Sequence, residues 1–97
     1  MSTFPVMLIS ALWPDSVSNT AVEQVSREAL SAIESRAKQK GLLRKFQYIN
    51  YAAPYQTPLA SYGAENLEFL GRVSKKYDPH ALFQTRVPGG FKLAQEQ

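Results

Sequence analysis

The chain has 97 residues, of which 44% are hydrophobic and 20% are charged, and its formal net charge is +3. This is the composition of an ordinary globular protein, and the length suits a single domain, 1–97, in which only 94–97 look disordered. The absence of cysteine excludes disulfides and thiolate metal sites. The basic residues around Gly41 lack the aromatic or glycine pattern of a nucleic-acid module, so no nucleic-acid partner is expected.

The first apolar stretch, 4–12, is hydrophobic on both alternating faces, which predicts a strand covered on both sides. It is too short to span a membrane and has no basic region before it, as a signal peptide would. We therefore expect a cytoplasmic protein without a membrane partner. Trp13 follows this strand and could cap a substrate pocket, although such a tryptophan more commonly packs in a core or an interface.

The next element is predicted to be a helix from about 21 to 39. Thr20 and Glu23 fit a capping box at its start, and Gly41 is a natural stop after its last turn. Helical spacing predicts a buried stripe made by Val22, Val25, Ala29, Ile33 and Ala37, with Leu30 beside them.

A second strand is expected over 42–51. Alternation would place Tyr48 and Asn50 on one face and Tyr51 on the other. Pro54 and Pro58 then hold 52–61 in a loop.

A second helix is expected to begin near Ala64 and to end at Asp78-Pro79. Leu67, Leu70 and Val73 follow its spacing. Asp78 is expected to cap a short turn over 79–82, with Phe83 packing back on the body of the protein. A turn at 88–90 and an extended tail over 91–93 complete the chain.

These elements predict an α+β fold, a small β-α-β-α unit with a mixed sheet. Two strands alone are marginally stable in water, and apolar strand edges invite pairing. We therefore expect the sheet to be completed from outside the monomer by dimerisation, which makes a homodimer the expected assembly.

Neutral hydrogen-bonding side chains gather between 46 and 62, where four of the five tyrosines lie. A tyrosine hydroxyl can polarise a carbonyl or act as an acid, and an asparagine amide can hold an oxyanion. The candidate catalytic residues are Tyr48, Asn50 and Tyr51, and the candidate substrate-binding residues are Trp13, Phe46, Tyr55 and Tyr62. Packing of the same tyrosines in the core is the structural alternative. His80, the single histidine, makes no metal site alone.

An ordered set of motifs lies between 46 and 93. It comprises Tyr48-Ile49-Asn50-Tyr51, Pro54, Tyr62-Gly63, Asn66-Leu67, Tyr77-Asp78-Pro79 with Phe83, and Pro88-Gly89-Gly90-Phe91. This set resembles the C-terminal region of fungal FAD-linked oxidases related to berberine bridge enzyme. The resemblance implies that Tyr48, Asn50 and Tyr51 face a pocket near flavin and substrate. The sequence departs from the pattern of that family at Ala53, a position that is commonly acidic there.

The flavin domain of that family has no counterpart in these 97 residues, and the chain has no residue suited to covalent flavin attachment. The leading hypothesis is therefore a stand-alone, cofactor-independent cyclase or isomerase acting on a small-molecule secondary metabolite. The first alternative is a tail subunit or fragment that completes an FAD-linked oxidoreductase, in which case a partner chain supplies FAD. The second is a non-catalytic small-molecule-binding or interaction module, and the last is an inert remnant.

Overall fold

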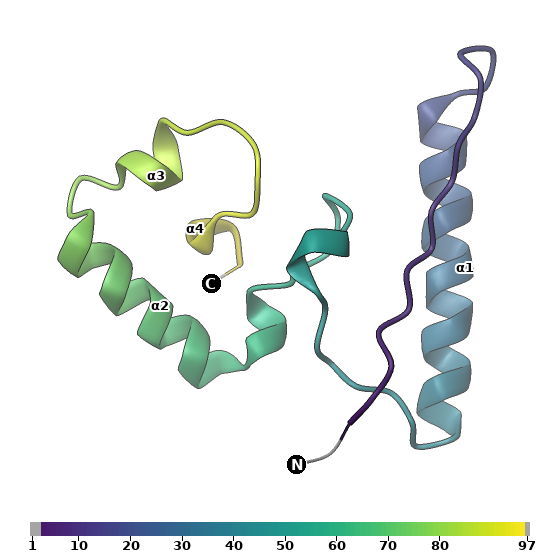
Figure 1. Ribbon diagram of the computed structural model, residues 1–97, viewed down its shortest axis with the longest axis horizontal. Coiled ribbons are helices and arrows are strands. Elements are labelled where there is room, and N and C mark those ends of the chain that lie inside the picture. The colour runs from purple at the N-terminus through teal and green to yellow at the C-terminus, as the bar shows by residue number, and fades with distance from the viewer. Residues whose placement is uncertain (1–2, 97) are drawn as a thin grey trace. The chain divides into compact units, whose positions relative to one another are not determined.

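A computed structural model describes residues 3–96 and divides the chain into two compact units, Met1–Arg44 and Lys45–Gln97. Every regular element in the described residues is helical (Figure 1). The elements are α1 (Asn19–Gln39), the short 3-10 helices η1 (Ile49–Tyr51) and η2 (Ala60–Tyr62), α2 (Ala64–Tyr77), α3 (Leu82–Thr85) and α4 (Leu93–Glu96). The predicted α+β fold with a mixed sheet is therefore wrong.

Both predicted strands are irregular segments instead. Residues 3–14 and 42–48 form neither helix nor strand, and the end of the second segment curls into η1. A strand exists only where a neighbour accepts and donates its backbone hydrogen bonds. Within residues 3–96 neither segment has such a neighbour, so apolar alternation alone did not produce a sheet.

Helix α1 in the first unit follows its predicted range closely. Its N-cap is Ser18, whose hydroxyl accepts a hydrogen bond from the Ala21 N–H at 3.4 Å, so the predicted cap at Thr20 is wrong. The stop at Gly41 is confirmed. The Gly41 N–H donates to the Lys38 carbonyl at 3.0 Å and the Leu42 N–H donates to the Ala37 carbonyl at 2.9 Å, which is a Schellman motif.

The predicted buried stripe of α1 is only partly correct. Val22 and Ala37 are half-buried as expected, whereas Val25 is 64% exposed and Ile33 is 40% exposed. The half-buried face of α1 comprises Val22, Ser26, Leu30, Glu34 and Ala37. Two of its five members are polar, so the described chain leaves much of the apolar surface of α1 uncovered.

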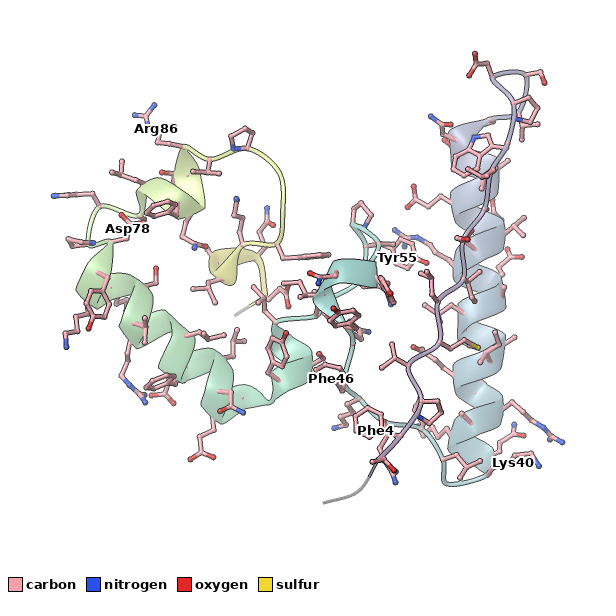
Figure 2. All side chains as sticks on the ribbon, viewed as in Figure 1. Phe4, Lys40, Phe46, Tyr55, Asp78 and Arg86 are labelled. Carbon is pink, nitrogen blue, oxygen red and sulfur yellow. The ribbon has the colours of Figure 1, made fainter. Side chains whose placement is uncertain are left out.

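Helix α2 in the second unit is confirmed at its predicted start. Leu67 is the residue of α2 that is buried, at 8% exposure. Figure 2 shows Asp78 at the junction between α2 and α3, where its two carboxylate oxygens accept the N–H groups of Leu82 and Phe83, each at 2.9 Å. The predicted cap at Asp78 is therefore present, but Phe83 is 68% exposed and does not pack back as expected.

The end of the chain is more ordered than the sequence suggested. After α3 the chain turns back toward the start of α2 (Figure 1), and α4 contacts α2. The Glu96 carboxylate accepts the Ala60 N–H at 2.7 Å, and the Leu93 N–H donates to the Gln84 side-chain oxygen at 2.8 Å. Residues 91–92 are non-helical as predicted, but 93–96, which include the end predicted to be disordered, form the short helix α4, and Gln97 lies outside the described residues.

Burial is sparse throughout the part of the chain that the structure describes. Only Pro58 and Leu67 are classed as buried there, whereas Leu12 is fully exposed and Tyr77 is 75% exposed. None of the helices in residues 3–96 combines the length and the apolar character needed to cross a membrane.

Candidate functional site

The 3-10 helix η1 brings together the three candidate catalytic residues. Its turn is closed by the Tyr51 N–H, which donates to the Tyr48 carbonyl at 3.0 Å. The rings of Tyr48 and Tyr51 meet edge to face, with centroids 4.8 Å apart and planes at 80°. The Asn50 side-chain N–H donates to the Tyr48 hydroxyl oxygen at 2.9 Å. Tyr48, Asn50 and Tyr51 therefore form one cluster, which we call the tyrosine cluster.

Alternation along a strand had placed Tyr51 on the face opposite Tyr48 and Asn50, and that prediction is wrong. A 3-10 helix has about three residues per turn, so residues three apart lie one above the other. Tyr48 and Tyr51 have this separation, and their ring contact follows from it. The turn therefore brings the three residues together in a way that the predicted strand would not have done.

The hydrogen bond from Asn50 determines whether the Tyr48 hydroxyl acts as a donor or an acceptor toward other groups. A phenol oxygen that accepts one N–H still carries its own hydrogen, which can be donated to another acceptor. The tyrosine cluster is therefore suited to hold a carbonyl or phenolic oxygen through Tyr48. Tyr48 is 38% exposed and Tyr51 is 54% exposed, so these residues can form one wall of a pocket but do not enclose one.

Phe46 and Tyr62 form a second aromatic contact in the same unit. Their ring centroids are 5.7 Å apart and their planes are tilted by 49°. Ser61 joins the two segments, because its hydroxyl oxygen accepts the Gln47 N–H at 2.9 Å while its hydrogen is donated to the Pro58 carbonyl at 2.6 Å. Phe46 and Tyr62 are thus tied to the stretch that carries the tyrosine cluster.

Tyr55 lies in the loop between η1 and η2, which Figure 2 shows together with Phe46. Gln56 closes that loop, because its side-chain oxygen accepts the Ala53 N–H at 2.9 Å and its own N–H donates to the Ala53 carbonyl at 2.9 Å. Tyr55 is half-buried there. A role for Tyr55 in substrate binding stays a prediction.

Trp13 belongs to the first unit of the chain, and the other candidates belong to the second. Its indole N–H donates to the Asn19 side-chain oxygen at 2.9 Å, at the first residue of α1. This bond accounts for Trp13 locally, as part of the turn that starts the helix. Its participation in a substrate pocket stays a prediction.

Sequence reasoning did not find the polar residues that hold the loop carrying Tyr55 and Tyr62. Gln47 accepts the Thr57 N–H at 3.1 Å through its side chain, and Glu96 reaches Ala60 from 36 positions away. Ser61 could have been suspected, because serine in a proline-rich loop commonly bonds to nearby backbone. The contact made by Glu96 has no local signal in the sequence.

A shallow groove of about 390 Å³ lies on one side of α2. It is lined by Ala64, Leu67, Glu68, Gly71, Arg72 and Lys75. None of the candidate site residues lines this groove. Within residues 3–96, no group of three or more histidine, cysteine, aspartate or glutamate side chains is placed to hold a metal ion.

Comparison with known proteins gives consistent matches to flavoenzymes. The chain is 41% identical over 81 residues to an FAD-dependent monooxygenase of Emericella nidulans, a match that covers 84% of the chain and 17% of the relative. It is 37% identical over 90 residues to an FAD-dependent monooxygenase of Aspergillus calidoustus, covering 93% of the chain and 17% of that protein. The chain matches a small part of fungal FAD-dependent monooxygenases.

Another relative is a bifunctional solanapyrone synthase of Alternaria solani, 38% identical over 86 residues, with 89% of the chain and 17% of the relative covered. The chain therefore spans about a sixth of the length of these curated relatives. No family model matches the chain. No solved structure matches it either.

The described residues contain no glycine-rich turn between a strand and a helix. A dinucleotide is commonly held by a glycine-rich turn between a strand and a helix, where backbone N–H groups face the pyrophosphate. Gly89 and Gly90 have left-handed backbone angles, but no strand precedes them and the four-residue α4 follows.

Proposed function

We propose that this chain acts as a segment of an FAD-dependent oxidoreductase, completing an enzyme whose flavin is held by residues outside these 97. The observation that carries the proposal is the match of nearly the whole chain to about a sixth of several fungal FAD-dependent monooxygenases. The motifs from Tyr48 to Phe91 favour the C-terminal region of such an enzyme. A small-molecule secondary metabolite is the proposed substrate class.

The exposed apolar surface supports a role inside a larger protein. Large hydrophobic side chains remain exposed in both units, including Leu12, Leu42, Phe69 and Phe83. Soluble proteins rarely leave such a large share of their big apolar side chains in contact with water. These side chains are explained if the remainder of a flavoenzyme covers them.

In this enzyme the tyrosine cluster supplies one wall of the substrate pocket. The Tyr48 hydroxyl, oriented by Asn50, donates a hydrogen bond to a carbonyl or phenolic oxygen of the substrate, and Tyr51 supports the Tyr48 ring. These residues carry no fixed charge, so they suit a neutral, flat molecule better than an anion. FAD would supply the redox chemistry, and these residues would bind and orient the substrate.

A cofactor-independent cyclase or isomerase is the weaker candidate. Such an enzyme works mainly by holding its substrate in a preorganised and largely dry cavity. Tyr48 and Tyr51 are exposed at 38% and 54%, and the groove on α2 does not include them. A stand-alone cyclase would need a second copy of the chain to build the missing walls.

A chimera tests the proposal directly. The matched segment of the Emericella nidulans monooxygenase is replaced by the corresponding 81 residues of this chain. We expect the chimera to purify with bound FAD and to oxidise the substrate of its parent. The matched controls are the unmodified parent and the parent with the segment deleted. A chimera as colourless and inactive as the deletion variant would contradict the proposal.

A further inference from the structure

Helix α2 carries apolar side chains on both of its sides. Its covered side contains buried Leu67 together with half-buried Leu70, Gly71 and Ser74. Phe69 follows Leu67 by two positions, which is about 200° around a helix with about 100° per residue. Phe69 is 56% exposed and therefore lies on the side that the described chain does not cover.

The uncovered side continues along α2, and a further exposed aromatic side chain follows in α3. Val73 and Tyr77 follow Phe69 at intervals of four residues, so the three share one side of the helix. Val73 is 36% exposed and Tyr77 is 75% exposed. Phe83 in α3 is 68% exposed. Its backbone N–H donates a hydrogen bond of 2.9 Å to the carboxylate of Asp78, the residue that directly follows α2. We call Phe69, Val73, Tyr77 and Phe83 the outer face.

Two cations lie over rings of the outer face. The Arg72 guanidinium carbon is 5.7 Å from the centroid of the Phe69 ring, and the Lys76 Nζ is 5.2 Å from that of Tyr77. Arg72 also bonds the Glu68 carboxylate at 2.9 Å, whereas Lys76 has no acidic partner among the described residues. The outer face is thus an aromatic surface with a basic edge, and it fits an apolar surface with carboxylates beside it.

We propose that the outer face is the surface through which this chain docks on the flavin-carrying part of the enzyme. Large apolar side chains that stay exposed along one side of a helix mark a surface that another part of a protein covers. The match covers only 17% of each relative, so the relatives contain a large body that could cover this helix. This inference rests on the proposed function and adds to it the contact surface and the chemistry of the surface it meets.

The test uses two chains expressed together. One is this 97-residue chain with an affinity tag, and the other is the Emericella nidulans monooxygenase without its matched segment. The measurements are the amount of FAD that co-purifies with the tag and the Kd of the two chains. We expect F69S and F83S each to raise the Kd by about tenfold or more, since buried aromatic anchors dominate interfaces.

The matched control is K75S on the opposite flank of α2. Lys75 is exposed, as Phe69 is, but it lies toward the groove of α2 and outside the outer face. It should leave the Kd within about twofold of the unmodified chain. Circular dichroism of each free chain should be unchanged, because the substituted side chains are exposed there.

The outcomes separate the two proposals. If the unmodified chain forms no yellow complex, both the proposed function and the docking surface are overturned. If the unmodified chain forms the complex but F69S and F83S bind as tightly as K75S, the proposed function stands and the docking surface is wrong. A complex weakened by the aromatic variants alone supports both.

Discussion

The bond between Asn50 and Tyr48 shows how a single hydrogen bond determines whether a hydroxyl group donates or accepts. A surface tyrosine can rotate its hydroxyl and accept or donate with many partners. Here the Asn50 N–H occupies the oxygen of Tyr48 at 2.9 Å, and the edge of the Tyr51 ring restrains the phenol. The hydroxyl hydrogen of Tyr48 is therefore left to donate to another acceptor.

This arrangement makes a prediction for the chimeric enzyme. Y48F removes the hydroxyl and should lower kcat/KM by about tenfold, which corresponds to a net hydrogen bond of about 1.4 kcal/mol. N50L should give a smaller loss, because the hydroxyl remains but is no longer oriented. Steady-state kinetics with the parent's substrate measures both effects, with S35A on the exposed surface of α1 as the control. Equal activity of Y48F and S35A would remove Tyr48 from the site.

At this scale the sequence predicted chemistry better than position. The cap at Asp78 follows from a local rule and is present, whereas the contact between Tyr48 and Tyr51 was not predicted, because strand alternation placed the two on opposite faces. The role of Glu96 was missed because its partner, Ala60, is 36 residues away. Long-range contacts of this kind leave no periodic pattern to detect.

Helices and strands differ in where their backbone hydrogen bonds are made. A helix satisfies its backbone internally, so apolar spacing and the glycine stop located α1 and α2 to within about two residues, although the predicted cap at Thr20 was wrong. A strand depends on a neighbour, and alternating apolar residues cannot show whether one is present. The segments 4–12 and 42–51 have the composition of strands but no pairing within residues 3–96.

Two glycines at helix ends allow a comparison of backbone strain. Gly41 after α1 has φ +68°, close to the left-handed helical region, whereas Gly63 before α2 has φ 97° and ψ 151°, a region essentially restricted to glycine. A Cβ added at either position would meet no atom within 4 Å, so the cost of alanine is backbone strain alone.

We therefore expect G63A to destabilise the chimera more than G41A. The change at Gly41 should cost about 1 kcal/mol and the change at Gly63 about 2–3 kcal/mol in the free energy of unfolding. Urea unfolding followed by circular dichroism measures both values. G41N serves as the control, since asparagine tolerates the left-handed region and should recover most of the loss. The reverse order of G41A and G63A would show that the two helix ends adopt other conformations in the assembled enzyme.

At the scale of the whole molecule, the balance between chain entropy and burial is unfavourable for an isolated chain. Ordering one residue costs about 1–2 kcal/mol of conformational entropy, which folded domains offset by burying apolar side chains. Only Pro58 and Leu67 are classed as buried in the described residues. The outer face of α2 and the apolar residues of 4–12 must therefore be covered by something else if the fold is to be stable.

The oligomeric state and the melting behaviour of the isolated chain show whether the flavin-carrying body or a second copy of the chain covers this surface. If the flavin-carrying body covers this surface, the purified 97-residue chain should sediment as a monomer. It should melt over a broad range, without the steep cooperative transition of a packed domain. Co-expression with the truncated monooxygenase should then produce a single sharp transition, because a partner that binds only the folded state stabilises it.

If a second copy covers the surface instead, the chain alone should sediment as a dimer and melt cooperatively at a temperature that rises with its concentration. Sedimentation velocity and calorimetry at two concentrations measure both properties, and a cooperative, colourless homodimer would favour the cofactor-independent hypothesis over assembly with a flavoenzyme.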